Sequence, residues 1–171
     1  MKIPCSDISQ HLKESLTSQV RELKHTGIIP KLVTILVGST PEQLSFVTIK
    51  KRIAHEIGVE FKLVHLTAPP SFENFKKIVI EKAREPSTSG IIIQHPFPGG
   101  YDVSKVYECI PPEKEIEGFR PDSAFRFPLS LAVLSGMKYI MNTETIKQEI
   151  RTPIDKYNKV VDLISLFDLL K

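Results

Sequence analysis

Apolar residues recur along the first part of the chain in alternating helical and strand-like blocks. Between positions 6 and 25 they fall three or four residues apart, which predicts a helix that Ser6 or Asp7 caps and Gly27 ends. Its apolar stripe consists of Ile8, Leu12, Leu16, Val20 and Leu23. The continuous apolar and β-branched run over residues 31–37 predicts a strand that is covered on both faces.

Three further blocks continue this alternation. A second helix is predicted from near Pro41, a residue suited to a first helical turn, to Ile57. Residues 59–66 predict a strand, and their imperfect alternation favours an edge position in the sheet. A third helix opens at Ser71, with apolar residues at helical spacing: Phe72, Phe75, Ile78, Val79 and Ala83. Residues 90–94 predict a short buried strand.

The order of strand, helix, strand, helix and strand is typical of right-handed parallel crossovers. The sequence therefore predicts an α/β fold, a three-layer α/β/α domain with a small, mainly parallel sheet and C-terminal helices. Residues 103–109 predict a short helix and residues 129–141 a strongly apolar one. Because the composition changes after Asn142, we expect one α/β domain over residues 1–141 and a helical extension over residues 142–171.

Composition and charge narrow the class of protein. With 171 residues, 41% hydrophobic and 25% charged, the chain fits one globular domain, or one domain with a helical extension. Its 23 basic and 20 acidic residues are interleaved, so we expect neither a nucleic-acid partner nor a membrane partner. No run approaches the roughly 20 apolar residues that span a bilayer. Cys5 and Cys109 form no metal-ligand spacing, which favours a reduced cytoplasmic protein without a metal.

Three short motifs carry the candidate chemistry. Residues 45–51 read Ser-Phe-Val-Thr-Ile-Lys-Lys, residues 91–98 read Ile-Ile-Ile-Gln-His-Pro-Phe-Pro, and residues 115–119 read Glu-Ile-Glu-Gly-Phe. In this order they resemble the catalytic motifs of the bifunctional methylenetetrahydrofolate dehydrogenase/cyclohydrolase family. That family usually reads Ser-Tyr-Val-x-x-Lys-x-Lys, Gln-Leu-Pro-Leu-Pro and Asp-Val-Asp-Gly-Phe. This chain differs by having Phe46 in place of the tyrosine, His95 in place of the leucine and Glu117 in place of the last aspartate.

The resemblance implies that Lys50 and Gln94 are the catalytic residues. Lys50 matches the lysine beside the reacting one-carbon bridge, where an amine can position water and stabilise changing charge during hydrolysis. Gln94 matches the glutamine that pairs with this lysine, and it follows a predicted strand at the edge where α/β sheets bind ligands. Without the motifs, Lys50 would be a solvated cation on a helix and Gln94 a loop-capping residue.

Phe46, Glu117 and Ser45 are the predicted substrate-binding residues. Phe46 lies one helical turn before Lys50 and can stack on the folate ring system, although it lacks a hydroxyl; a core aromatic is the alternative. Glu117 matches the carboxylate that binds the amino-pyrimidine edge of the pterin, and its alternative is a surface acid. Ser45 would cap or orient the aromatic helix face rather than touch the ligand. His95 is expected to be an exposed loop residue outside the catalytic set.

The family normally inserts a dinucleotide-binding domain after the third motif. Here residues 120–127 alone separate Phe119 from Pro128, and residues 126–134 resemble the family's final helix. The chain also contains no Gly-x-Gly-x-x-Gly motif. We therefore expect a reduced folate as the substrate, no NADP and no dehydrogenase activity. The chain would at most hydrolyse 5,10-methenyltetrahydrofolate to 10-formyltetrahydrofolate; the alternative is a catalytically impaired protein that binds folate or a partner protein.

Residues 154–170 carry an apolar stripe at helical spacing, formed by Ile154, Tyr157, Val160, Val161, Ile164, Phe167 and Leu169 or Leu170. Exposure of such a stripe to water is unfavourable by about 25 cal/mol for each Å² of apolar area. We therefore expect this helix to be covered, within the monomer, in a homodimer or by a partner protein. An ordinary terminal helix on the same core is the alternative.

Overall fold

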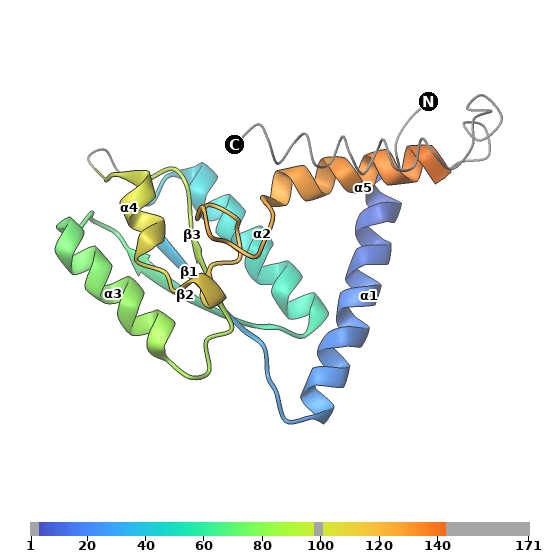
Figure 1. The fold of residues 1–171 in the computed structure, drawn as a ribbon, viewed down its shortest axis with the longest axis horizontal. Helices are drawn as coiled ribbons and strands as arrows, with labels where there is room; N and C mark the ends of the chain where they lie inside the picture. Colours follow the sequence, from blue (N-terminus) through green and yellow to red (C-terminus); the bar gives the residue numbers. More distant parts are fainter. Residues whose placement is uncertain (1–3, 98–100, 143–171) are drawn as a thin grey trace.

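The computed structural model describes residues 4–97 and 101–142, so the helix predicted at residues 154–170 lies outside the described residues. Helices and strands alternate as the sequence predicts, and the α/β fold is confirmed (Figure 1). In chain order the elements are α1 (Cys5–His25), β1 (Lys31–Val37), α2 (Pro41–Ile57), β2 (Glu60–Leu66), α3 (Phe72–Arg84), β3 (Gly90–Ile93), α4 (Val103–Glu108), the 3-10 helix η1 (Pro112–Lys114) and α5 (Pro128–Asn142).

Three parallel strands form the sheet in the order β2-β1-β3. Leu32 of β1 pairs with Phe61 of β2 on one side and with Gly90 of β3 on the other. The edge position predicted for β2 is confirmed, and its residues are more exposed than those of the central strand β1. Because the strands are parallel, their carboxyl ends meet at one edge of the sheet.

The two faces of the sheet are covered by different helices (Figure 1). On one face, α3 and the α4 segment pack against β1 and β3 in a buried core of Val33, Ile35, Val37, Phe75, Val79, Ala83, Ile91, Ile93, Val106, Tyr107, Cys109 and Ile110. On the other face lies α2, which buries Val47 and Ala54. α1 lies outside α2 and is joined to it by an ion pair between Lys13 and Glu56 at 3.2 Å.

The first turn of α2 is fixed by a capping box. The Thr40 side chain accepts a hydrogen bond from the Gln43 backbone N–H, and the Gln43 side chain accepts one from the Thr40 N–H. The Gln43 amide also donates to the carbonyls of Val37, at the end of β1, and Pro96, in the turn after β3. These bonds tie α2 to the carboxyl edge of the sheet, where the catalytic residues are predicted.

The predicted caps of α1 are wrong. The helix begins at Cys5, so Ser6 and Asp7 lie inside its first turn, and no side chain caps it. The Pro4 carbonyl instead accepts hydrogen bonds from the backbone N–H groups of Asp7 and Ile8 at 3.1 Å each. A proline at this position fits because it has no backbone N–H to leave unsatisfied.

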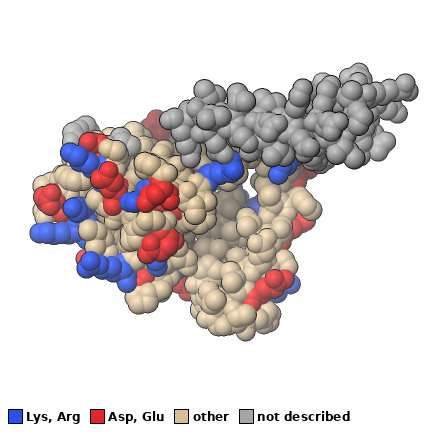
Figure 2. All heavy atoms as spheres, in the orientation of Figure 1, with Lys and Arg blue, Asp and Glu red and all other residues tan. Residues whose placement is uncertain are grey.

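Large apolar side chains on α1 and α5 remain exposed, among them Leu12, Leu16, Leu129 and Val133. The surface is hollowed between the α/β body and α1 (Figure 2). Over the described ranges, residues 4–97 and 101–142, no helix has the length and apolar composition needed to cross a membrane.

Candidate active site at the carboxyl edge of the sheet

Lys50 and Gln94, the two predicted catalytic residues, contact each other directly. Lys50 lies on α2, and Gln94 follows β3, whose ladder it extends by donating its backbone N–H to the Ile35 carbonyl at 2.9 Å. The Lys50 ammonium donates from Nζ to Gln94 Oε1 at 2.9 Å, and Gln94 Nε2 donates to the His95 carbonyl at 2.8 Å. Both ends of the buried Gln94 amide are therefore held, which fixes its orientation.

The Glu117 carboxyl lies in the electrostatic field of Lys50. Burial raises the pKa of Glu117 to about 7, although the Lys50 charge and the Ile93 backbone N–H pull this pKa down and Glu115 pushes it up. Its Oε2 atom is buried and has no hydrogen-bond partner among the described residues. The alternative of a surface acid is therefore wrong. A carboxyl group that titrates near neutral pH and keeps a buried acceptor is suited to binding a polar ligand.

Burial also changes the Lys50 amine. It lowers the pKa of Lys50, and the negative charge of Glu117 offsets part of this effect by raising it. A lower pKa makes the neutral amine more accessible than it is for a solvated lysine, so Lys50 is better placed to accept and return a proton. The alternative of a fully solvated cation does not describe this residue.

The loop that carries Glu117 is held by a second, fully buried carboxylate, Glu115. Its two oxygens accept hydrogen bonds from the backbone N–H groups of Glu117 at 2.7 Å, Gly118 at 3.2 Å and Phe119 at 3.4 Å. Gly118 has a φ of 72°, and a Cβ there would lie 2.7 Å from the Phe127 nitrogen, so only glycine fits. This role of Glu115 was not predicted from the sequence, although the first acidic residue of the third motif was a signal for it.

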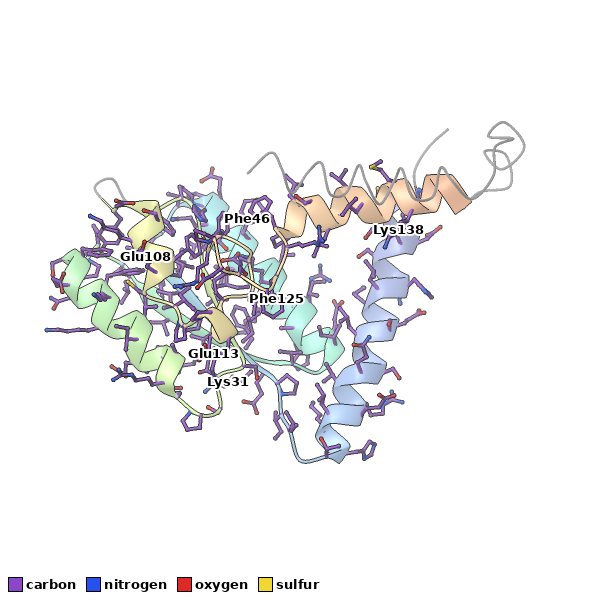
Figure 3. The ribbon with its side chains drawn as sticks, viewed as in Figure 1. Lys31, Phe46, Glu108, Glu113, Phe125 and Lys138 are labelled. Atoms are coloured by element: carbon purple, nitrogen blue, oxygen red, sulfur yellow. The ribbon has the colours of Figure 1, made fainter. Side chains whose placement is uncertain are left out.

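Phe46 and Ser45 lie on the exposed surface of α2. Phe46 is 57% exposed, so the alternative of a core aromatic is wrong (Figure 3). Because Phe46 precedes Lys50 by one helical turn, the two residues lie on the same face of α2, and the exposed Phe46 ring is open to a ligand above this face. Ser45 is exposed beside it.

His95 is half-buried rather than exposed, which corrects the expectation for this residue. Its Nε2 atom lies 2.7 Å from the Tyr107 hydroxyl, and its ring centroid lies 4.2 Å from that of Phe97. Burial lowers the pKa of His95, and the nearby Lys50 charge lowers it further. Sequence reasoning missed this cluster because its members come from separate segments of the chain.

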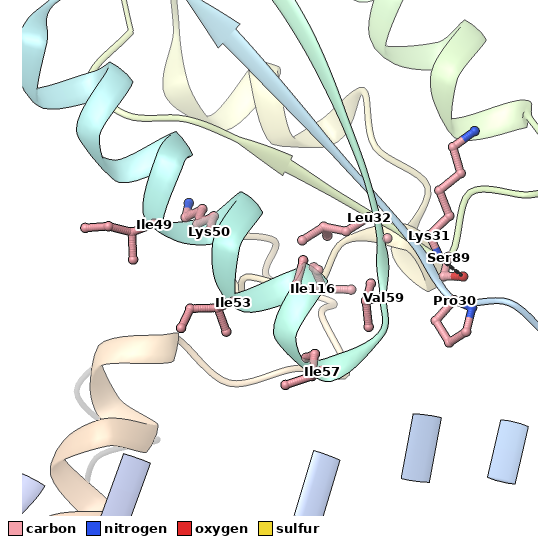
Figure 4. Close-up of a pocket in the computed structure, with 12 residues that line it drawn as sticks. Pro30, Lys31, Leu32, Ile49, Lys50, Ile53, Ile57, Val59, Ser89 and Ile116 are labelled. Atoms are coloured by element: carbon pink, nitrogen blue, oxygen red, sulfur yellow. Dashed lines mark hydrogen bonds between the residues drawn. The ribbon is translucent and has the colours of Figure 1, made fainter. Parts of the chain in front are cut away.

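A pocket of about 440 Å³ adjoins the site along α2 (Figure 4). Lys50 forms part of the pocket wall, and the rest of the wall is mainly apolar. The other lining residues are Pro30, Lys31, Leu32, Ile49, Ile53, Ala54, Ile57, Val59, Ser89, Gly90 and Ile116. Gln94 and Glu117 do not line this pocket. The pocket therefore extends from Lys50 toward the amino ends of the strands, whereas the polar groups gather at the carboxyl edge.

The fold and this geometry define a three-layer α/β domain with groups capable of acid–base chemistry at the edge of a parallel sheet. The chain belongs to the tetrahydrofolate dehydrogenase/cyclohydrolase family: residues 3–117 match the catalytic domain of that family. The resemblance inferred from the three motifs is thereby confirmed. Within the described part of the chain, no group of three or more His, Cys, Asp or Glu side chains could hold a metal ion.

Related proteins share this domain but are longer. The bifunctional protein FolD of Staphylococcus haemolyticus is 38% identical over 116 residues, which cover 68% of this chain and 41% of that protein. The FolD of an Exiguobacterium species is 30% identical over 143 residues, covering 81% of this chain and 51% of that protein. This chain thus spans about half the length of these relatives, or less.

Solved structures show the same arrangement of elements. The bifunctional enzyme FolD, a methylenetetrahydrofolate dehydrogenase/cyclohydrolase from Campylobacter jejuni, superposes with a TM-score of 0.77 at 25% identity, covering 81% of this chain and 52% of that one. A 5,10-methylenetetrahydrofolate dehydrogenase from the silkworm Bombyx mori gives a TM-score of 0.74 at 22% identity, covering 80% and 50%. The silkworm enzyme shares the fold.

Proposed function

We propose that this domain binds a reduced folate and hydrolyses 5,10-methenyltetrahydrofolate to 10-formyltetrahydrofolate. The observation that carries this proposal is the 2.9 Å hydrogen bond between Lys50 Nζ and Gln94 Oε1, beside the buried carboxyl of Glu117. Relatives of this family are named as bifunctional dehydrogenase/cyclohydrolases. Because these 171 residues contain no Gly-x-Gly-x-x-Gly motif, we assign only the step that needs no NADP.

The proposed step adds water to the electrophilic carbon that bridges N5 and N10. The water oxygen bonds to this carbon and loses both of its protons, one on attack and one as the formyl C=O forms. The bond from the carbon to N5 breaks, and N5 keeps the electron pair and gains one of these protons. One proton is released overall. Lys50, whose pKa burial lowers, accepts the proton from water, while Gln94 holds the amine in position through its Oε1 atom.

Glu117 and Phe46 would hold the substrate during this step. The Oε2 atom of Glu117, which has no hydrogen-bond partner among the described residues, can accept hydrogen bonds from the N–H donors of a pterin edge, which satisfies a buried acceptor. The exposed Phe46 ring can stack on the planar ring system. Ser45 contributes indirectly, through the local surface of α2.

Phe46→Tyr is expected to raise the rate of hydrolysis by about 2- to 10-fold, the effect of one added hydrogen bond of ordinary strength. Tyrosine keeps the stacking face and adds the hydroxyl that this chain lacks. Initial rates at saturating 5,10-methenyltetrahydrofolate measure the effect. Phe61→Tyr, a partly exposed position on the edge strand β2, is the control. Equal rates for wild type and Phe46→Tyr would show that the missing hydroxyl does not limit the reaction.

The alternative function is binding without catalysis. In that case the chain is a catalytically impaired protein that binds folate or associates with another protein, including a second copy of itself. The exposed apolar side chains of α1 and α5 favour this alternative. Calorimetric titration of the full chain with 5,10-methenyltetrahydrofolate separates the two. Saturable binding with accelerated hydrolysis supports the proposed function, and binding without hydrolysis supports the alternative. The absence of binding would overturn the assignment of a folate site, and NADP-dependent oxidation of methylenetetrahydrofolate would overturn the restriction to hydrolysis.

A further inference from the structure

The His95 ring is enclosed by aromatic side chains from three separate segments. Its Nε2 atom lies 2.7 Å from the hydroxyl of Tyr107, a residue of α4 that is 2% exposed. Its centroid lies 4.2 Å from that of Phe97, in its own turn, and 5.2 Å from that of Phe119, in the loop after Glu117. Tyr107 and Phe119 also stack, with centroids 4.4 Å apart and planes inclined by 19°.

This cluster connects the two segments that carry Gln94 and Glu117. The backbone carbonyl of His95 accepts the hydrogen bond from Gln94 Nε2 at 2.8 Å, so the position of His95 determines how the Gln94 amide is oriented. Phe119 lies two residues after Glu117, and its backbone N–H donates to the same Glu115 carboxylate that binds the Glu117 N–H. A hydrogen bond that fixes His95 against Tyr107 therefore acts on both halves of the site.

Burial and the nearby charges shift the pKa of each group in this pair in the direction that favours its neutral form. Burial lowers the pKa of His95, and the Lys50 charge lowers it further. Burial raises the pKa of the Tyr107 hydroxyl well above its usual range, and the charges of Glu117 and Glu115 act in the same direction. A neutral imidazole and a neutral phenol form a hydrogen bond in which one group donates and the other accepts, without burying a net charge.

We propose that His95 and Tyr107 are positioning residues that hold the Gln94 amide, and with it the Lys50–Gln94 pair, in one orientation relative to Glu117. Neither residue needs to touch the substrate. The buried hydroxyl of Tyr107 explains how a polar His95 is accommodated where the family motif has leucine. The orientation that the His95–Tyr107 pair gives to the Gln94 amide does not depend on which reaction the domain catalyses. The expected effect of this pair on the rate of hydrolysis rests on the proposed function.

Tyr107→Phe tests this proposal with Tyr101→Phe as its matched control. Tyr101 donates its hydroxyl to a half-buried partner, the Pro70 carbonyl at 2.5 Å, and its ring packs against Phe72 and Phe75 of α3. Each variant loses one hydroxyl and keeps its ring. We expect similar decreases in the urea midpoint for both, but a change in the NMR signals of the Gln94 side-chain amide only in Tyr107→Phe. These signals are assigned by comparison with Gln94→Asn.

The rate of hydrolysis gives a second readout. We expect Tyr107→Phe to lower kcat by about 3- to 10-fold while KM changes less than about two-fold, since the pair orients Gln94 rather than binding substrate. His95→Leu removes the other partner and should reproduce both effects. The double variant should be no worse than either single variant, because it leaves no buried polar group without a partner.

The two readouts separate this proposal from the proposed function. If the Gln94 signals change in Tyr107→Phe and in His95→Leu but no variant or wild type hydrolyses the folate, the positioning pair stands and the proposed function fails. Unchanged Gln94 signals in Tyr107→Phe, or an equal change in Tyr101→Phe, would overturn the positioning role. If Tyr107→Phe does not fold, His95→Leu alone decides by the same signals.

Discussion

Replacing Lys50 with methionine is expected to slow the hydrolysis of 5,10-methenyltetrahydrofolate by at least about 100-fold, the lower range for removing a group that transfers protons in a reaction. Methionine keeps an apolar stem along α2 but provides no amine to bond Gln94 Oε1 or to accept a proton. The urea midpoint should change little, because burial already disfavours the charged amine and lowers the pKa of Lys50.

Lys51→Met is the matched control for this prediction. Lys51 is the next residue of α2, and its side chain is exposed. The Lys51→Met variant should therefore retain wild-type activity and stability. Equal activity of the Lys50→Met variant and the wild type, or an equal loss in both methionine variants, would show that Lys50 does not carry the reaction.

Glu117→Gln is expected to make the free protein more stable at alkaline pH and to weaken folate binding. In the folded chain the pKa of Glu117 is raised to about 7, above its ordinary value of 4.5. The unfolded chain therefore ionises this group first, and its favourable contribution to folding is present below about pH 4.5 and is lost as the pH rises to about 7. Glutamine removes this loss, so we expect roughly 1–3 kcal/mol of added stability at pH 8 and almost none near pH 4.

Urea unfolding at several pH values measures this effect, and Glu113→Gln provides the control. Glu113 belongs to the same charged run but is exposed (Figure 3), so its replacement should leave the pH dependence of stability unchanged. Folate affinity should fall in Glu117→Gln alone, since an amide cannot supply two acceptor oxygens. Parallel stability curves for wild type and Glu117→Gln between pH 4 and 8 would contradict the buried environment of this carboxyl.

Features that depend on local sequence were predictable. The bounds of β1 and α2 match the predicted ones because a continuous apolar run, Pro41 and Gly58 define them within a few residues. The meeting of Lys50 and Gln94 followed from the motifs together with parallel topology, which brings the end of β3 beside α2. The catalytic and binding roles of the named residues remain predictions.

Other contacts between distant segments were not predictable from residue patterns. Glu115 belongs to a charged run typical of a solvated surface, yet it is fully buried because a parallel bridge to Ile91 places it against β3. His95 looked like an exposed loop residue because Tyr107, its partner, comes twelve positions later on another element. In both cases a polar side chain is buried because the fold supplies its hydrogen bonds.

The rate at which the full chain converts 5,10-methenyltetrahydrofolate to 10-formyltetrahydrofolate, measured without NADP, tests the central claim most directly. We predict a rate that saturates with substrate and exceeds that of the Lys50→Met variant by at least about 100-fold. A rate equal to that of buffer alone, at protein concentrations that saturate folate binding, would contradict the assignment of Lys50 and Gln94 as a hydrolytic pair.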